Sequence, residues 1–355
     1  MPAAAEPLRI VAVGGGTGLS SLLRGLKQYV NDPVPRPGAA APSLEPHVEI
    51  TAVVTVTDDG GSSGRLRREL DMLPPGDIRN CMVALSEDEG LMSQLFQYRF
   101  ASGRGLKGHS FGNLFLTALA QLTGDFAKAV ALSAEVLATR GRIFPSTSSN
   151  VALEAVLEDG STVRGETLIS RSRRRIRRIR LHPRRCRPLP ETLEAIEKSD
   201  LICLGPGSLY TSVIPNLLVE GVARSIRRSR ARKACFVNLM WQPGETVGYT
   251  ASQHVEAIFN HAGEGLVDYV VVNCQPVPAR RRKRYAEQDA FPVAVDWDRL
   301  ESMGLNIVTA DLLDRSEQVR HAPDRTAALA VHMAVQARRE QIRRAAAPQH
   351  RNLKR

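Results

Sequence analysis

Three glycine-rich loops, each directly after a short apolar run, constrain the fold of this chain more than any other feature. The apolar runs occupy residues 9–13, 48–56 and 201–204, and the loops that follow them occupy residues 14–18, 57–64 and 205–212. Later apolar runs alternate with helical patterns, at residues 234–239, 269–273 and 307–309. Strands that alternate with helices predict an α/β fold with a doubly wound, mainly parallel sheet and Rossmann-like glycine loops. Because ligands bind outside the carboxyl ends of such strands, we expect the three loops to form one site.

The alternation of strand and helix is interrupted in the middle of the chain. Residues 151–157 alternate apolar and polar, Asp159-Gly160 is a strong hairpin signal, and a returning strand is expected at 162–169. A helical stretch at 77–137 is long enough to form part of a lid. We therefore expect a nucleotide-binding core in two halves, of which the first carries the helical lid. A β-rich excursion with an arginine-rich segment separates the two halves, and a disordered basic tail follows the second half. In chain order these parts are residues 1–140, 141–190, 191–347 and 348–355.

Composition and charge narrow the class of protein. The chain has 355 residues, five widely spaced cysteines and 5% aromatic residues. A protein without a signal-like N-terminus, a long apolar run or paired cysteines is expected to be cytoplasmic and not inserted in a membrane. Much of the net charge of +11 lies in residues 171–187 and 338–355. Such runs are usually solvated, and few aromatics are available to stack on bases, so nucleic acid is not expected as a partner.

The first loop lies between an expected strand and an expected helix. Glycines let the backbone approach a phosphate closely, and a helix N-terminus supplies free N–H groups. The spacing is neither the G-x-G-x-x-G dinucleotide fingerprint nor a P-loop. A tight turn alone would not need three consecutive glycines, so the loop predicts anion binding. Its candidate residues are Gly14, Gly15, Gly16, Thr17 and Gly18.

The second and third loops add polar side chains to the same edge of the sheet. Asp58 and Asp59 are adjacent carboxylates, which repel unless a cation or a ligand hydroxyl lies between them. Either could bind Mg²⁺ together with the phosphates of a ligand, or the pair could belong to an exposed turn. In the third loop, a serine hydroxyl could cap a helix, bind the ligand, or do both. The other candidates of these loops are Gly60, Gly61, Ser62, Ser63, Gly205, Gly207 and Ser208.

Two helical segments carry further candidates. Asp77 and Asn80 are one turn apart at an expected helix start, where Asp77 alone is best explained as a helix cap. His109 and Asn113 are spaced i, i+4 and would share a helix face. A ligand role and a structural role remain equally open for this second pair.

Together these motifs resemble the YvcK/CofD-like family. The resemblance rests on the three loops and on residues 76–81, 108–114, 215–218 and 242–246, and it extends to the region of Arg320. One branch of the family resembles 2-phospho-L-lactate transferase, which transfers a phospholactyl group from a guanylyl-activated donor to a deazaflavin alcohol. The other, the YvcK branch, comprises gluconeogenesis factors that affect bacterial cell shape and bind UDP-N-acetylglucosamine. The motifs at 58–63 and 242–246 look like the YvcK branch.

The resemblance implies a UDP-sugar site that includes Tyr285 and Arg320. Trp241 and Ala322 stand where the family usually has Thr and Asp. We therefore expect a regulator of cell shape, cell-wall metabolism and carbon metabolism that binds UDP-N-acetylglucosamine without turning it over. The alternatives are a Mg²⁺-dependent transferase, with Asp58 or Asp59 as catalytic residues, and, more weakly, a nucleic-acid or membrane-surface adaptor that acts through the arginine-rich run. Whether a reaction is catalysed and whether the chain forms a homo-oligomer both stay open.

Overall fold

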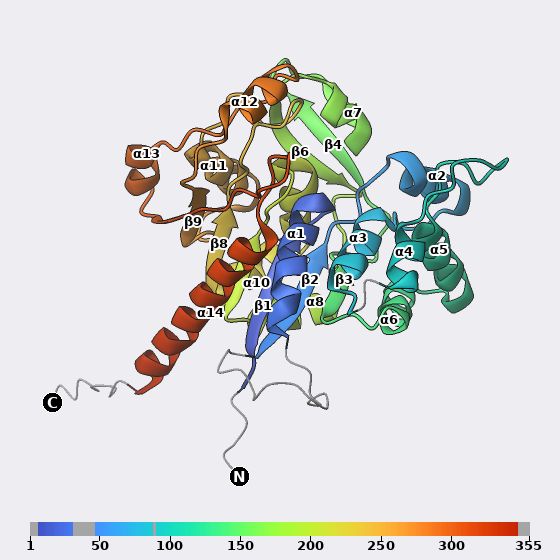
Figure 1. The fold of residues 1–355 in the computed structure, drawn as a ribbon, viewed down its shortest axis with the longest axis horizontal. Coiled ribbons are helices and arrows are strands. Elements are labelled where there is room, and N and C mark those ends of the chain that lie inside the picture. The colour runs from blue at the N-terminus through green and yellow to red at the C-terminus, as the bar shows by residue number, and fades with distance from the viewer. Residues whose placement is uncertain (1–5, 31–46, 88–89, 347–355) are drawn as a thin grey trace, which may run out of the picture.

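The computed structural model describes residues 6–30, 47–87 and 90–346, and its centre is a seven-stranded sheet (Figure 1). The strand order is β10-β9-β8-β7-β1-β2-β3, and each neighbouring pair is parallel. The predicted α/β class with a parallel sheet is confirmed. The strands are β1 (Leu8–Gly14), β2 (Val48–Val54), β3 (Arg142–Pro145), β7 (Leu201–Leu204), β8 (Arg232–Phe236), β9 (Tyr269–Asn273) and β10 (Asn306–Ala310).

Alternate residues of the central strands enter two separate apolar layers, one on each face of the sheet. On β1, Ile10 and Ala12 belong to one buried cluster, whereas Val11 and Val13 belong to the other. Because successive side chains point to opposite faces, a strand covered on both faces must be apolar at nearly every position. This is why these strands appear in the sequence as continuous apolar runs.

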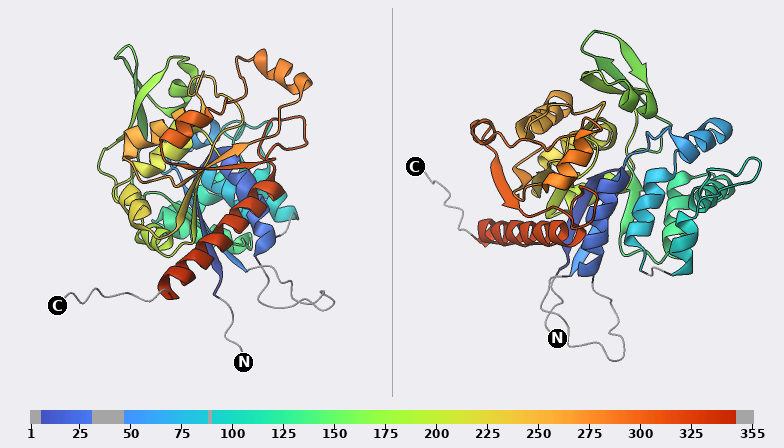
Figure 2. Two further views of the ribbon diagram at one scale, coloured as in Figure 1. Left: turned by 90° about the vertical axis from the view of Figure 1, so that its left-hand side faces the viewer. Right: turned by 45° about the horizontal axis from the view of Figure 1, so that its top comes forward.

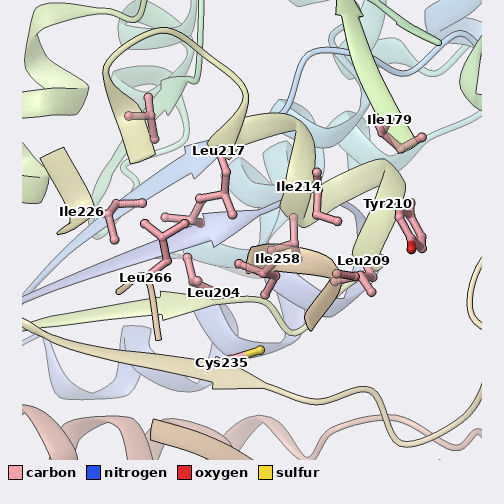
Figure 3. Close-up of a cluster of buried hydrophobic side chains, with 14 of the residues drawn as sticks. Ile179, Leu204, Leu209, Tyr210, Ile214, Leu217, Ile226, Cys235, Ile258 and Leu266 are labelled. Carbon is pink, nitrogen blue, oxygen red and sulfur yellow. The ribbon is translucent and has the colours of Figure 1, made fainter. Parts of the chain in front are cut away.

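Helices cover both faces of the sheet (Figure 1). The layer that contains Ile10 is covered by α1 (Gly16–Leu26), α3 (Gly76–Leu85) and α14 (Pro323–Ala346). The opposite layer is covered by α8 (Pro190–Glu197), α9 (Ile214–Leu217), α10 (Val222–Arg228) and α11 (Ala251–Ala262). Figure 3 shows part of this second layer, where Leu204 of β7 lies among Ile214 and Ile258 from the covering helices.

The long helix α14 is tied to the beginning of β1 and β7 by a buried ion pair. Nε and Nη2 of Arg338 each donate to a different carboxylate oxygen of Asp200, both at 2.6 Å. The same carboxylate accepts the backbone N–H of Arg9 at 2.8 Å. Since the Asp200 side chain is only 4% exposed, this pair is shielded from water and orients α14 across the sheet.

A second, three-stranded sheet projects beyond the carboxyl ends of the main strands (Figure 2). It contains β4 (Ala152–Leu157), β5 (Thr162–Arg164) and β6 (Ile176–His182), all antiparallel, in the order β5-β4-β6. The predicted hairpin between β4 and β5 is confirmed. The predicted return strand at 162–169 is wrong beyond Arg164, because Gly165 has a φ of +100° and α7 (Glu166–Arg171) begins after it. Since β3 belongs to the main sheet, the excursion also begins later than residue 141.

The remaining elements flank these two sheets. The predicted helical stretch is confirmed as α3, α4 (Leu91–Gln97), α5 (Phe111–Thr123) and α6 (Phe126–Val136), preceded by α2 (Gly61–Leu70). Two short α-helices, α12 (Ala279–Ala286) and α13 (Trp297–Ser302), a 3₁₀ helix, η1 (Lys27–Tyr29), and a π-helix, η2 (Leu209–Val213), complete the described elements. All five cysteines are free, and no helix in the described ranges has the length and apolarity to cross a membrane. The predicted disordered tail, 348–355, lies outside the described residues.

Candidate functional site

A cavity opens at the carboxyl ends of β1 and β7, and a second cavity adjoins it. β2 and β3 lie on one side of β1, whereas β7 to β10 extend on the other, so this is the switch point at which ligands of open α/β sheets bind. The two cavities have volumes of about 240 and 310 Å³ and share Thr17, Ser21, Arg320 and His321. Together they fall in the range of 300–1,000 Å³ that is typical of small-ligand sites.

The structure brings together some of the predicted site residues and separates others. The residues that line the first cavity are Gly15, Gly16, Thr17, Gly18, Gly207, Ser208, Tyr285 and Arg320, and Asn80 lines the second. The residues that line neither cavity are Gly14, Asp58, Asp59, Gly60, Gly61, Ser62, Ser63, Asp77, His109, Asn113 and Gly205. The predicted residues of the second loop therefore lie outside both cavities.

Close packing explains two of the glycines in the first loop. A Cβ on Gly18 would lie 2.6 Å from the carbonyl oxygen of Pro206 and 2.9 Å from Cα of Gly207. A Cβ on Gly15 would lie 2.5 Å from Oδ2 of Asp77. Gly15 has an extended backbone, with φ of −176°, so at this position the glycine is required by contact and not by conformation. The first and third loops thus meet backbone to backbone beside the pocket.

Side chains from the loop after β8 hold Ser208 in the wall of the pocket. Nε2 of Gln242 donates to Oγ of Ser208 at 2.7 Å, and Nδ2 of Asn238 donates to Oε1 of Gln242 at 3.0 Å. Ser208 precedes η2 but makes no capping hydrogen bond, so the structure does not show the cap that was one alternative for this residue, and its hydroxyl accepts from Gln242 instead. The hydroxyl proton remains free to be donated to a ligand.

Glu245 fixes the third loop from behind. Its carboxylate accepts the backbone N–H of Tyr210 at 3.1 Å and the hydroxyl of Thr211 at 2.9 Å. Glu245 is 6% exposed, and burial raises the pKa of its carboxyl group, whereas these two hydrogen bonds act in the opposite direction. The segment at 242–246, known from the sequence only as a motif, therefore works as a brace for the loop after β7.

Tyr285 and Arg320 reach the pocket from two segments that are distant in sequence from the glycine loops. The hydroxyl of Tyr285, on α12, accepts the backbone N–H of Val319 at 3.0 Å. This bond ties α12 to the segment that carries Arg320, which follows β10. Arg320 is exposed, and in the described part of the chain its guanidinium has no hydrogen-bond or ion-pair partner. A cation without a partner beside a glycine loop is suited to an anionic ligand.

The adjacent carboxylates of the second loop point in different directions. Oδ1 of Asp59 accepts both the backbone N–H of Thr167, at 2.9 Å, and its hydroxyl, at 2.7 Å. Oδ1 of Asp58 accepts the N–H of Gly60 at 2.8 Å, the bond expected of an Asx turn. Asp59 is thus occupied in holding α7 of the excursion. Among the described residues, no group of three or more His, Cys, Asp or Glu side chains is arranged to hold a metal ion.

Asp77 lies behind the first loop with its carboxylate against Gly15. It is not the helix cap that its position suggests, because α3 already begins at Gly76 and Pro75 occupies the cap position. Burial, and then the neighbouring Asp58 carboxylate, raise the pKa of Asp77 to about 7. Burial and the same two aspartates raise the pKa of Glu166, at the start of α7, to about 9. Near neutral pH, burial and mutual repulsion therefore oppose further ionisation of the carboxyl groups behind the first loop.

His109 and Asn113 join the α5 end of the helical stretch to the second glycine loop. Nδ1 of His109 is 2.9 Å from the hydroxyl of Ser62, and Nδ2 of Asn113 is 3.5 Å from that of Ser63. The expected shared helix face is wrong, because α5 begins at Phe111 with Ser110 as its cap and His109 precedes it. Both residues are nevertheless buried and contact the same helix, α2. Their role in this structure is to position the second loop.

Sequence reasoning did not select ten further residues that line the first cavity, and the four discussed here are Asn238, Trp241, Gln242 and His321. His321 is 7% exposed, burial lowers its pKa to about 4, and its Nε2 has no hydrogen-bond partner among the described residues. Nε1 of the Trp241 ring is also buried without a described partner. The only sequence signal for these residues was their place within or beside motifs already noted.

Comparison with known proteins gives consistent matches over most of the chain. The family model for 2-phospho-L-lactate transferase CofD matches residues 10–313. A gluconeogenesis factor of Halalkalibacterium halodurans is 47% identical over 313 residues, which cover 88% of this chain and 92% of that protein. The gluconeogenesis factor of Bacillus subtilis is 44% identical over 326 residues, covering 92% and 98%. A crystal structure of a UPF0052 family member from Bacillus halodurans aligns with a TM-score of 0.84 at 45% identity, covering 92% of this chain and 100% of that one.

Proposed function

This chain belongs to the CofD family and is similar to its gluconeogenesis factors, and we propose that it is a cytoplasmic regulator of cell shape and of cell-wall and carbon metabolism that binds UDP-N-acetylglucosamine without turning it over. The observation that carries this proposal is the single cavity shared by the first glycine loop, Tyr285 and Arg320. The sequence resemblance alone implies the tyrosine and the arginine, whereas the loop is indicated by its own chemistry.

The cavity offers groups that suit each part of a nucleotide sugar. The backbone N–H groups at the start of α1 and the unpaired Arg320 suit a diphosphate, which a guanidinium can bind bidentately. The ring of Tyr285 offers a flat apolar face to a base or sugar, while its hydroxyl is already bonded to Val319. His321 stays neutral at physiological pH, so it adds no positive charge to this site.

A Mg²⁺-dependent 2-phospho-L-lactate transferase acting on a guanylyl-activated donor is the second candidate, favoured by the family match. Asp58 and Asp77 would then supply carboxylates, because Asp59 is bonded to Thr167. Two carboxylates and the phosphates of a donor can bind Mg²⁺, which would stabilise negative charge on the leaving group. The pKa of Asp77 is raised because its negative charge is disfavoured at this buried position, so a cation bound beside its carboxylate would be favourable.

Calorimetric titration with UDP-N-acetylglucosamine, GDP and NAD, each with and without Mg²⁺, tests the proposal. We expect saturable binding of the UDP-sugar, at least tenfold tighter than that of the comparators and independent of Mg²⁺. Tyr285→Ala and Arg320→Ala should each weaken it about tenfold or more, which corresponds to about 1.4 kcal/mol. Tyr285→Phe keeps the ring and removes only the hydroxyl, so it separates stacking from the bond to Val319.

Arg282→Ala is the matched control for Arg320→Ala, because Arg282 is an exposed arginine on α12 that does not line the cavity. An equal loss of affinity in both arginine variants would indicate general charge attraction and would contradict a specific role for Arg320. Selective binding of GDP that requires Mg²⁺ and is lost in Asp58→Asn would favour the transferase. If none of the three ligands binds, the nucleotide-sugar assignment is wrong.

A further inference from the structure

The strongest charged feature outside the site is the arginine-rich run of the excursion. Residues 164–187 contain eleven arginines, no lysine and one glutamate, so this short segment alone has a charge of +10, close to the +11 of the whole chain. The sequence suggested a solvated run, yet part of it, with Arg177, Arg178 and Arg180, forms the ordered strand β6. The charge is therefore presented on a defined surface.

The strand register places three arginines of the small sheet on the same side of it. Arg164 on β5 and Arg180 on β6 both lie opposite Glu154 on β4, and Arg178 lies one row along, opposite Val156. The intervening residues of β4 and β6, such as Leu153 and Ile179, are buried (Figure 3 shows Ile179). We name this side of the sheet the arginine face. It carries Arg164, Arg178 and Arg180, and we include in it the arginines that directly precede and follow β6.

Most of these arginines have no acidic neighbour. In the part of the chain that the structure describes, only three of the eleven form ion pairs, namely Arg174 with Asp159, Arg175 with Glu158, and Arg180 with Glu154 at 4.0 Å. Of the eleven, all but Arg180 are exposed. A surface with so much unneutralised charge repels itself and is stabilised by a polyanion.

We propose that the arginine face binds the phosphate backbone of a nucleic acid duplex without reading its sequence. Arginine, used here to the exclusion of lysine, bonds phosphate oxygens bidentately. Along β6, Arg178 and Arg180 are two residues apart, or about 6.8 Å, which is roughly twice the axial spacing of successive phosphates on one strand. Each guanidinium can therefore meet a separate phosphate.

The same surface is poorly suited to other anionic partners. Residues 151–188 contain no Phe, Tyr or Trp, so there is no ring to stack on the bases of a single strand or to anchor in a membrane interface. Leu168 is the large apolar side chain that the described excursion exposes, at 56%. One such residue does not supply the apolar core of a protein–protein interface. A rigid array of phosphates fits the observations best.

Fluorescence anisotropy of the full chain with a 30-base-pair DNA duplex and its RNA counterpart tests this inference. The comparators are the corresponding single strands and anionic phosphatidylserine vesicles. We expect the full chain to bind the duplexes at low salt. The logarithm of the association constant should fall linearly with the logarithm of the salt concentration, with a slope of about −0.9 for each phosphate contacted. The triple variant R164Q/R178Q/R180Q should weaken binding at least tenfold and reduce the slope by about 2.7, the effect of three contacts.

R339Q/R343Q/R344Q removes the same charge from exposed positions of α14 and should leave duplex affinity within twofold of the original. A second test variant, R184Q/R185Q, lies after β6 and does not touch strand pairing, so a loss of affinity there supports the inference even if the triple variant folds poorly. Absence of duplex binding, equal losses in the α14 control, or tighter binding to single strands or vesicles would each overturn it. UDP-N-acetylglucosamine titration of the same variants should be unchanged, which separates this test from that of the proposed function.

Discussion

Replacing Gly18 by alanine has two opposing effects on the stability of the protein, one through helix propensity and one through packing. Gly18 lies in the first turn of α1, where alanine is favoured over glycine by up to about 1 kcal/mol. Helix propensity alone therefore predicts a more stable protein. The structure predicts the opposite, because the new Cβ would lie 2.6, 2.8 and 2.9 Å from three backbone atoms of Pro206 and Gly207.

The size of the packing effect follows from what the methyl group meets. Overpacking of this kind typically destabilises by about 1–3 kcal/mol, and contacts with backbone cannot be relieved by a rotamer change. We take the upper end, about 3 kcal/mol, and subtract the gain in propensity to obtain a net loss of about 2 kcal/mol. Gly14→Ala is the matched control, since its Cβ would come no closer than 3.7 Å to any neighbour.

Urea unfolding followed by circular dichroism measures both variants. With an m-value of roughly 3–4 kcal/mol/M, the Gly18→Ala midpoint should fall by about 0.5–0.7 M, while that of Gly14→Ala should change little. Since the first and third loops must separate to admit the methyl group, affinity for UDP-N-acetylglucosamine should also fall about tenfold in Gly18→Ala only. A Gly18→Ala protein that is as stable as the original and binds equally well would refute the claim that these loops pack backbone to backbone.

Three further predictions concern buried carboxylates. Because Asp77 has a pKa of about 7 and an anionic ligand favours its protonated form, affinity should fall as pH rises from 6 to 8, and calorimetry should find this dependence flattened in Asp77→Asn. Glu245→Ala leaves a buried N–H and the Thr211 hydroxyl without an acceptor and should lower the free energy of unfolding, measured in urea, by about 2–4 kcal/mol. Asp200→Asn removes the charge partner of Arg338 and should lower that free energy by about 3 kcal/mol at low salt.

The sheet and its glycine loops could be predicted because both depend on local rules. A strand buried on both faces must be apolar throughout, and a loop after such a strand must lie at the carboxyl edge of the sheet. Local rules also identified the hairpin at Asp159-Gly160. They identified Gly15 and Gly18 as special, although the reason, contact with Asp77 and Pro206, is tertiary.

The features that sequence reasoning missed depend on partners far along the chain. The sequence predicts a strand where α7 lies, because the contact that stabilises the first turn of this helix comes from Asp59, 108 residues away from Thr167. The strand β6 was not recognised because the register shifts opposite Leu157, so Ile176, Ile179 and Leu181 do not alternate strictly. One extra residue is enough to hide a period of two. Likewise, nothing local connects Tyr285 with Val319 or with the first loop.

The contacts of α7 join the two surfaces that the proposals treat separately. On one side, Thr167 is held by Asp59 of the second glycine loop. On the other side, the carbonyl oxygen of Ser170 lies so close to Gly244 that a Cβ there would collide with it. Gly244 belongs to the same short segment as Glu245, which braces the third loop. A displacement of the second or third loop on ligand binding would therefore act directly on α7, and through β5 and the residues leading into β6 on the arginine face, without passing through the main sheet.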